Sequence, residues 1–422
     1  MKKIIITFTL LLSICLPSYS EIVHISMEKA VELAIENNLD IKSKRKRAEE
    51  LQQEIKIANA LKNPQFQSNF LMGKVTRGNS SQFGLAVPIE INKRSIRKKI
   101  AQTNLEIVKN EIRAAEHDLK IEIMRNYFNI LYIKSVVLIL QDREKLFNNM
   151  KTIAEGKPKN SINYDIDLMQ SDIKYKKQLV FLNRAKANLL EAQFKLNETM
   201  NIKDSKIMYD TTESSLFTKN LSIMRLHLLP YEQIENIALE YSYGLAIANS
   251  NIKKSEQEIS QAKRKRIPDV TIAGGYAYQT SKQTGGEALP GAFVGITTEL
   301  PILYTFNPEI KEAKIVLERK QLDKESFENH LRYTLKSDYN KFKYAKENLI
   351  HYQEILKESK NILDMHAKRY EKGESSFLNL MQVETMYQET LRDYIGAMEV
   401  YYNAYLDLMH NVGHDILLQD EL

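Results

Sequence analysis

Two stretches of this chain share a sequence pattern at a fixed separation along the chain. Leu168-Met169-Gln170 recurs as Leu380-Met381-Gln382, 212 positions later, and Tyr127 and Tyr339 are separated by the same offset. Further apolar and aromatic positions repeat at this offset: Leu179, Leu182, Leu189 and Leu196 against Leu391, Tyr394, Tyr401 and Leu408. A constant offset over about 70 residues indicates an internal duplication, because unrelated helices do not stay in register over such a length.

Each half predicts the same order of elements: helix, strand, strand, long helix, helix. In the first half these are 26–62, 65–72, 82–91, 94–154 and 165–200, and in the second 231–266, 270–280, 292–302, 308–371 and 375–412. Apolar residues at three- and four-residue spacing predict the helices, and alternation predicts the strands. Pro64 and Pro268 end the first helix of each half, because proline cannot continue a helix.

The four predicted strands have the length of tilted membrane-spanning β-strands. In the second of them Phe83, Leu85, Val87 and Ile89 lie on one side, and the other side carries Gly84, Ala86, Pro88 and Glu90. Four strands cannot close a barrel, and each unpaired backbone group in hydrocarbon costs several kcal/mol. The strands must therefore close between chains, with eight strands from two copies or twelve from three. The helices are predicted to be too polar for a bilayer, so they project into an aqueous space.

The first twenty residues differ in composition from the rest. A basic start and an apolar run at 4–16 are followed by small residues at Ser18 and Ser20, the pattern of a secretory signal peptide cleaved after Ser20. Cys15 follows Ile14, whereas a lipidated cysteine would follow a small residue, so plain cleavage is favoured over lipidation. The mature chain then contains no cysteine, which excludes disulfides, thiolate zinc sites and cysteine nucleophiles.

These patterns divide the chain into five parts: a signal peptide at 1–20, a first repeat at 21–200, an irregular connector at 201–229, a second repeat at 230–414 and a tail at 415–422. Gly373 lies between the last two predicted helices. A glycine there can adopt a positive φ and end a helix, so we predict a hairpin turn at this residue.

Basic residues gather where helices meet the predicted strands. Lys263, Arg264 and Arg266 precede the third strand, and Lys93, Arg94 and Arg97 follow the second. One interpretation is that both clusters ring a mouth of the barrel and face lipid headgroups. The other is that the first complements a helix C-terminus and the second is a solvated helix face. No nucleic-acid partner is predicted, because no aromatic stacking pattern or recognition module accompanies the charges.

No pattern for catalysis or for a cofactor is present. The sequence lacks a phosphate-binding glycine loop, Gly-x-Ser-x-Gly, His-Glu-x-x-His and a calcium loop. His410 and His414 have metal-ligand spacing, but Gly413 lies between them at a predicted helix end and no third ligand is near. We therefore predict no enzyme, no metal site and no cofactor.

Taken together, the signal peptide and the duplicated unit make the chain resemble the TolC-type outer-membrane efflux proteins over essentially the whole mature length. The opening helix at 26–38, the prolines before the strands and Arg369-Tyr370-x-x-Gly373 carry the resemblance, and the segment 84–93 is similar to the heavy-metal (CzcC-like) branch. The resemblance implies a mainly α homotrimer in which twelve strands form an outer-membrane β-barrel on a periplasmic α-helical tunnel.

The resemblance also implies a function. Such proteins are passive channels in the outer membrane that extend into the periplasm. They dock through a periplasmic adaptor onto an inner-membrane pump of the RND or ABC type, and they perform no chemistry. Two alternatives stay open: an outer-membrane component of type I protein secretion, and a secreted coiled-coil scaffold that forms no channel.

The periplasmic gate implied by the resemblance lies at the two hairpin tips. Its positions are Asp167, Gln170, Tyr370, Ser375, Asn379 and Gln382. Tyr370 and Asp167 are expected to bond across the tips. The family's acidic ring falls on Asn379 and Gln382, so this chain has neutral amides where a ring of carboxylates would attract cations.

Overall fold

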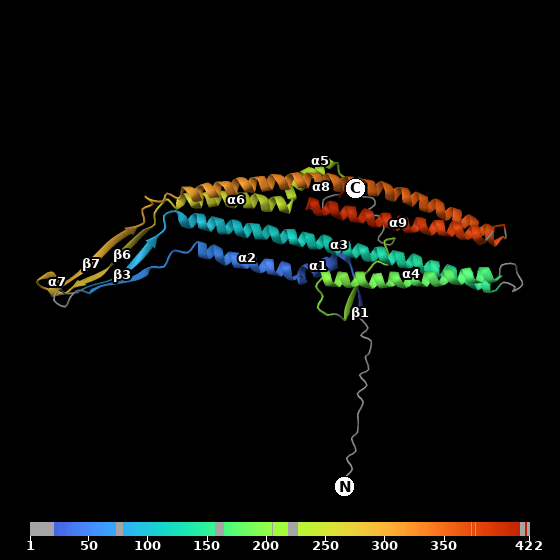
Figure 1. Ribbon diagram of the computed structural model, residues 1–422, viewed down its shortest axis with the longest axis horizontal. Helices are drawn as coiled ribbons and strands as arrows, with labels where there is room; N and C mark the ends of the chain where they lie inside the picture. Colours follow the sequence, from blue (N-terminus) through green and yellow to red (C-terminus); the bar gives the residue numbers. More distant parts are fainter. Residues whose placement is uncertain are drawn as a thin grey trace, which may run out of the picture.

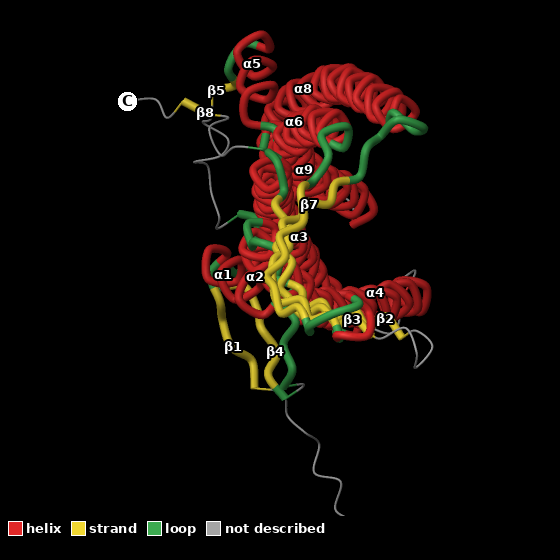
Figure 2. Tube along the Cα trace, turned by 90° about the vertical axis from the view of Figure 1, so that its left-hand side faces the viewer, coloured by secondary structure: helices red, strands yellow, loops and turns green. Residues whose placement is uncertain are grey.

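The computed structural model describes residues 21–72, 79–156, 164–204, 206–217, 227–372, 374–375, 377–413 and 418–419. Within them the chain forms a long, narrow body in which a four-stranded sheet continues into helices that lie side by side (Figure 1). Seen along the body, strands and helices follow an arc that is open on one side (Figure 2). The predicted signal peptide and Gly373 lie outside the described residues.

The two halves contain the same main elements in the same order. The first half has α1 (Met27–Asn37), α2 (Leu39–Ala58), β2 (Gln65–Met72), β3 (Asn79–Ile89), α3 (Lys93–Glu155) and α4 (Tyr164–Thr199). The second has α5 (Tyr231–Tyr241), α6 (Tyr243–Arg264), β6 (Val270–Gln279), β7 (Leu289–Thr298), α8 (Asn307–Glu371) and α9 (Phe377–Val412), with the short α7 (Ser281–Thr284) between its strands. The predicted order of elements, a mainly α fold with four strands, is confirmed.

The first helix of each half is interrupted, which corrects the predicted continuous helices at 26–62 and 231–266. Asn38, with φ −59° and ψ 122°, ends α1, and its side chain accepts a hydrogen bond from the Ile41 N–H at 2.9 Å. Ser242, with φ −58° and ψ 121°, ends α5, and its hydroxyl accepts from the Leu245 N–H. An extended residue with a short polar side chain therefore ends one helix and caps the next in both halves.

The sheet has the strand order β2-β3-β6-β7, with every neighbour antiparallel. Its central pair joins the two halves, with Gly84 of β3 opposite Gly275 of β6. β3 begins three residues earlier than predicted, and β7 ends at Thr298 because its pairing with β6 ends there, opposite Val270. Within the described residues β2 and β7 are the unpaired edges of this sheet.

The central helix of the body is α3, which packs against α2, α4, α6 and α9. Phe128 of α3 stacks on Tyr402 of α9 with ring centroids 4.4 Å apart. By length and composition alone α3 is apolar enough to cross a membrane, contrary to the prediction that the helices are too polar. Its contacts with four helices account for this apolar content, because α2, α4, α6 and α9 cover different faces of α3.

The connector at 201–229 contains strands, which corrects its prediction as irregular. β4 (Ile207–Thr211) pairs in parallel with β1 (Glu21–Ile25), and β5 (His227–Leu228) pairs with β8 (Leu418–Gln419). The Tyr127 hydroxyl of α3 donates to the Ile25 carbonyl at 3.1 Å, and Lys134 Nζ lies 2.8 Å from Asp210 Oδ2. These contacts hold the β1–β4 pair against the middle of α3.

Candidate functional site

One face of the four-stranded sheet is apolar and exposed. On β3 it carries Phe83, Leu85, Val87 and Ile89, as the alternation predicts. Their cross-strand partners and the next residues along each row are also apolar and exposed: Phe66, Ile272, Tyr276, Val294 and Ile296. Val294 is 82% exposed. A contiguous apolar face of this kind is unfavourable in water and suits a hydrocarbon environment.

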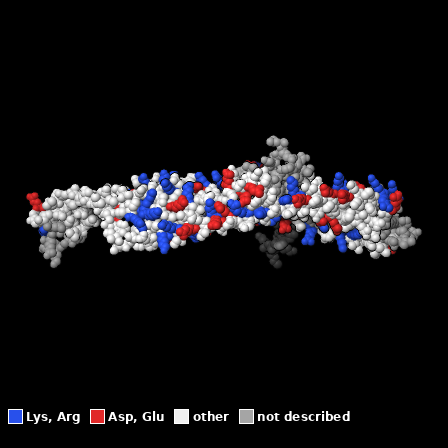
Figure 3. Space-filling model, turned by 90° about the horizontal axis from the view of Figure 1, so that it is seen from above, with Lys and Arg blue, Asp and Glu red and all other residues white. Residues whose placement is uncertain are grey.

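The opposite face of the sheet is small and polar. Most of its residues are glycine, alanine, serine, threonine, asparagine or glutamine, among them Gln67, Thr271 and Thr297. Its large apolar residues are Leu71, Leu289 and Phe293. None of the residues in β2, β3, β6 and β7 carries a charge. Figure 3 shows the contrast between this largely uncharged end and the helical body, which is covered with charged side chains.

The centre of the small-residue face depends on two glycines. A Cβ atom on Gly275 would clash with the Phe83 carbonyl oxygen and lie 2.5 Å from the Gly84 Cα. A Cβ atom on Gly84 would lie 2.8 Å from the Phe293 ring, which therefore extends across both glycines from the edge strand. The close approach of backbones and an aromatic ring requires residues without side chains here.

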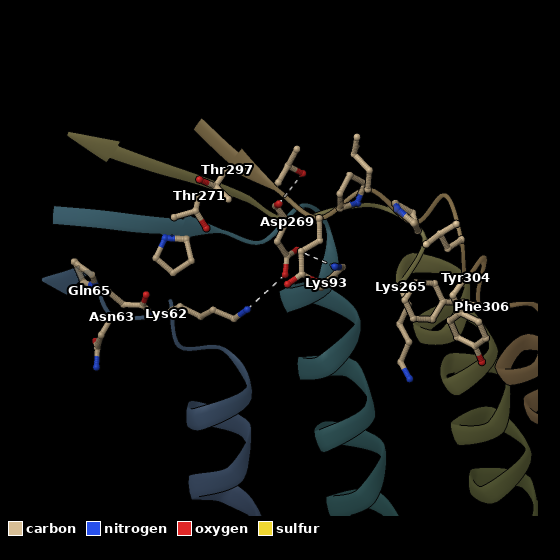
Figure 4. A pocket seen from close by; sticks show the side chains of 18 residues that line it. Lys62, Asn63, Gln65, Lys93, Lys265, Asp269, Thr271, Thr297, Tyr304 and Phe306 are labelled. Atoms are coloured by element: carbon tan, nitrogen blue, oxygen red, sulfur yellow. Dashed lines mark hydrogen bonds and ion pairs between the residues drawn. The ribbon is translucent and has the colours of Figure 1, made fainter. Parts of the chain in front are cut away.

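Five charged residues form a connected group where the strands meet the helices, and we call them the collar: Lys62, Glu90, Lys93, Arg97 and Asp269. Arg97 donates to both carboxylate oxygens of Glu90, at 2.7 and 2.9 Å, and its Nε donates to the Ala58 carbonyl at 3.0 Å. Lys93 Nζ lies 2.9 Å and Lys62 Nζ 3.5 Å from Asp269 (Figure 4). Lys62 Nζ also lies 3.4 Å from Glu90, so it bridges the two carboxylates. The collar therefore connects the C-terminal ends of α2 and β3 and the N-terminal end of α3 to the start of β6.

The collar lowers the pKa values of both its carboxyl groups. Hydrogen bonds from Arg97 hold the pKa of Glu90 below its ordinary value, despite partial burial. Burial alone would raise the pKa of Asp269, but the hydrogen bonds and positive charges of Lys93 and Lys62 hold it below its ordinary value. Both carboxylates are consequently ionised at neutral pH, and the pairs are intact there.

Four of the six predicted membrane-interface basic residues have partners within the chain. Lys93 and Arg97 belong to the collar. Arg264 donates to Ser95 Oγ at 2.9 Å, and Arg266 Nε donates to the Thr305 carbonyl at 2.9 Å. The remaining two, Arg94 and Lys263, are exposed, and neither has a polar partner among the described residues. Contact with lipid headgroups stays a prediction for this group.

Both hairpin tips lie at the end of the body opposite the sheet (Figure 1). Gln170, Asn379 and Gln382 are exposed there, and Ser375 is half-buried. Asp167 lies in the first turn of α4 and Tyr370 in the last turn of α8. The side chains of these two residues lie outside the described part of the structure, so their bond across the tips stays a prediction.

Solved outer-membrane channels share this architecture. The Campylobacter jejuni CmeC channel is 16% identical over 92% of this chain and 85% of its own, with a TM-score of 0.68. The open state of the Neisseria gonorrhoeae MtrE channel is 14% identical over 92% and 88%, and CusC is 14% identical over 92% of both chains, each with a TM-score of 0.70. At this identity the likeness establishes the fold.

Residues 236–414, most of the second repeat, match the model of the outer membrane efflux protein family. The second repeat therefore carries the sequence pattern of that family. The predicted location, in the outer membrane and extending into the periplasm, agrees with this family and with the outer-membrane channels of the same fold. No curated protein sequence matches the chain significantly.

Near the tip of the body the structure also brings together two residues that the sequence interpretation did not connect. Glu384 of α9 is 2% exposed and lies against Arg143 of α3. It faces the neighbouring hairpin of its own chain.

Among the described residues no group of three or more His, Cys, Asp or Glu side chains is placed to bind a metal. His410 lies 3.1 Å from Asp118, and His414 is outside the described residues.

Proposed function

We propose that this protein is the passive exit duct of a tripartite system, formed by three copies of the chain. Through a periplasmic adaptor it would receive cargo from an inner-membrane pump of the RND or ABC type. One observation carries the proposal: a charge-free sheet with an exposed apolar face and two unpaired edges continues into a charge-covered helical body (Figures 1 and 3). The sheet suits lipid, and the helices suit water.

Closure of the ring follows from the two edges. β2 and β7 run antiparallel, so β7 of one copy can pair with β2 of the next. Head-to-tail contacts of this kind close into a ring when the rotation between copies is right. Three copies supply twelve strands, and the arc in Figure 2 corresponds to one sector of the resulting tube. The apolar face would then contact lipid, and the small-residue face would line the pore.

The outer side of α4 offers a second contact between copies. Ile166, Ile173, Val180 and Phe194 lie on it at multiples of seven residues, and each is more than half exposed. Apolar side chains at this spacing form a coiled-coil seam, which requires a partner helix. Because α4 packs on α3 with its other side, a neighbouring copy is the partner that ring closure would bring to this seam.

The two hairpin tips would form the inner end of the duct. There the predicted contact between Asp167 and Tyr370 would hold the tips closed, and the adaptor would dock. A Tyr370→Phe variant should then conduct more in planar bilayers, because the phenolic donor is gone. Unchanged conductance would contradict this role.

At the other end of the helices, Arg94 and Lys263 are exposed close to the collar and would lie at the level of the lipid headgroups.

The proposal is tested by two lysine substitutions on the same edge strand. Val294→Lys places a charge on the apolar face, and Thr297→Lys places one on the small-residue face of β7. A lysine facing lipid near the bilayer midplane costs about 2–4 kcal/mol. We expect Val294→Lys to reduce the heat-modifiable oligomer in outer-membrane fractions. Thr297→Lys should assemble normally and shift the pore towards anions.

Two results would contradict the duct. A protein that stays soluble without detergent as a monomer supports the scaffold interpretation instead. Equal effects of the two lysines on assembly would show that the faces of the sheet do not divide lipid from pore.

A further inference from the structure

A buried ion pair joins the two helical hairpins of the protomer near the tip. Arg143 lies on α3 of the first hairpin and Glu384 on α9 of the second. The Glu384 side chain is 2% exposed and that of Arg143 is 27% exposed. Arg143 Nε is 3.9 Å from Glu384 Oε1, a distance too long for a hydrogen bond.

The pair is poorly satisfied. Both carboxylate oxygens of Glu384 and the Nε of Arg143 are buried without a hydrogen-bond partner among the described residues. The guanidinium lies instead over the ring of Phe147, 5.2 Å from its centroid. A buried carboxylate without hydrogen bonds is costly, because water no longer stabilises its charge. The packed seam therefore stabilises the ionised form of Glu384 poorly.

Apolar side chains surround this position. Phe147 and Met150 of α3 pack with Met381 of α9 in one buried cluster. The other charged group that acts on Glu384 is Lys174 of α4. The side chain of Gln388, one turn further along α9, is a polar neighbour that also favours the ionised carboxyl group. From α8, Asp364 acts on Tyr387, and His366 has a buried Nδ1 without a partner. Within the described residues no cation from these elements is hydrogen-bonded to Glu384.

Protonation of Glu384 should therefore favour the packed seam. Burial raises the pKa of Glu384, while the positive charge of Arg143, the nearby Gln388 side chain and the positive charge of Lys174 oppose that rise. If α9 moved away from α3, water would reach the carboxyl group and its pKa would return towards the ordinary value. A pKa that is raised in the packed state stabilises packing at low pH, and this stabilisation is lost as the pH rises through it.

We propose that Arg143 and Glu384 form a latch between the two hairpins of each protomer, and that Glu384 binds a proton when the tip is closed and releases it when the hairpins separate. Glu384 is then a positioning residue for the gate and does not line the pore. The proposal rests on the proposed duct, because only a channel makes separation of the hairpins a functional step.

The test is the conductance of the purified trimer in planar bilayers between pH 5 and pH 8. The wild type should open more as the pH rises, by up to about tenfold for each unit by which the pKa differs between packed and separated states. Glu384→Gln, which keeps the shape of the protonated group, should stay closed with a flat pH profile. Glu389→Gln, an exposed position on the same helix, should keep the wild-type profile.

A second variant covers the case in which Glu384→Gln does not assemble. Arg143→Met removes the charge that favours the carboxylate, so opening should shift to higher pH. A purely structural role would lower the yield of trimer without moving the pH profile. Wild-type pH dependence in both variants would overturn the latch.

The latch and the duct fail in different ways. If the wild type forms no heat-modifiable oligomer and never conducts, the proposed duct is wrong. If the wild type conducts and its pH profile does not depend on Glu384 or Arg143, the duct stands and the latch is wrong.

Discussion

Asn38 and Ser242 occupy corresponding positions in the two halves of the chain and adopt the same backbone conformation, with φ and ψ within about one degree. Each ends a helix, and its backbone N–H bonds to the carbonyl of the alanine four residues earlier, Ala34 or Ala238. Both alanines have no exposed surface. Each also caps the helix that follows. The duplication has therefore kept a bend whose chemistry, an amide in one half and a hydroxyl in the other, has diverged.

Replacing either cap should destabilise the protein by about 1 kcal/mol, because a helix N–H loses its acceptor. Asn38→Ala and Ser242→Ala test this, with Asn38→Asp as the matched control that keeps an acceptor. Circular dichroism at 222 nm should show lower melting temperatures for the alanine variants and little change for the aspartate. Equal losses for alanine and aspartate would show that the amide NH₂, not the cap, matters at residue 38.

Periodicity predicted the long helices well, because one row of buried and half-buried positions on α9 follows three- and four-residue spacing without a break. Met381, Gln388, Leu391, Ile395, Met398, Tyr402, Tyr405, Met409 and Val412 lie on this seam, and Glu384 falls on it too. A charged residue at a position of this apolar row predicts a contact with another helix. Its partner could not be predicted, because the seam does not say whether α3, α8 or another copy faces it.

Other features depend on contacts between distant parts of the chain. Arg97 and Glu90 are close in sequence, but Asp269 joins them only through the pairing of β3 with β6. β1 and β4 are five residues each, too short for alternation to be recognised, and they pair across most of the first repeat. The helix breaks were missed because asparagine and serine also occur inside helices, so only the extended backbone shows their role.

The collar should make assembly sensitive to acid. The pKa of Glu90 is lower in the folded protein than its usual value of 4.5, so its pair with Arg97 stabilises the fold above that value. The stabilisation is lost as the pH falls from about 4.5 through the lowered pKa. We expect the trimer to melt at a lower temperature on semi-native gels at pH 3 than at pH 7. Arg97→Lys, which cannot make the two-pronged contact, should show a smaller difference.

Lys134 and Asp210 should show strong coupling in a double-mutant cycle. Both side chains are nearly nine-tenths buried and their charged atoms lie 2.8 Å apart. Removing one partner leaves an unpaired buried charge, at a cost of about 3–5 kcal/mol. Lys134→Met and Asp210→Leu should each lower the melting temperature, and the double variant should recover much of the loss. Additive losses would contradict this account of how the β1–β4 pair is held.

Gly275→Ala should prevent normal assembly of the sheet. Its added methyl group would meet the backbone of Phe83 and Gly84 on the neighbouring strand, and backbone atoms cannot rotate away. Gly286→Ala is the control, since a Cβ atom there meets nothing within 4 Å. Outer-membrane fractions should contain little heat-modifiable oligomer for the first variant and wild-type amounts for the second. Normal assembly of Gly275→Ala would mean that the two central strands lie further apart than the structure shows.

The neutral amides at Asn379 and Gln382 should give a channel that polyvalent cations block weakly. Asn379 and Gln382 are exposed at the second hairpin tip, and a ring of neutral amides does not concentrate cations as a ring of carboxylates does. Asn379→Asp combined with Gln382→Asp would add six charges in a trimer and should increase block by hexaamminecobalt(III) at least about tenfold, since charge density sets the local cation concentration. Gln52→Asp combined with Gln53→Asp at exposed positions on α2 places the same six charges away from the tips and should leave block unchanged. Nanomolar block of the wild type would show that carboxylates elsewhere, such as Glu374, already line the opening.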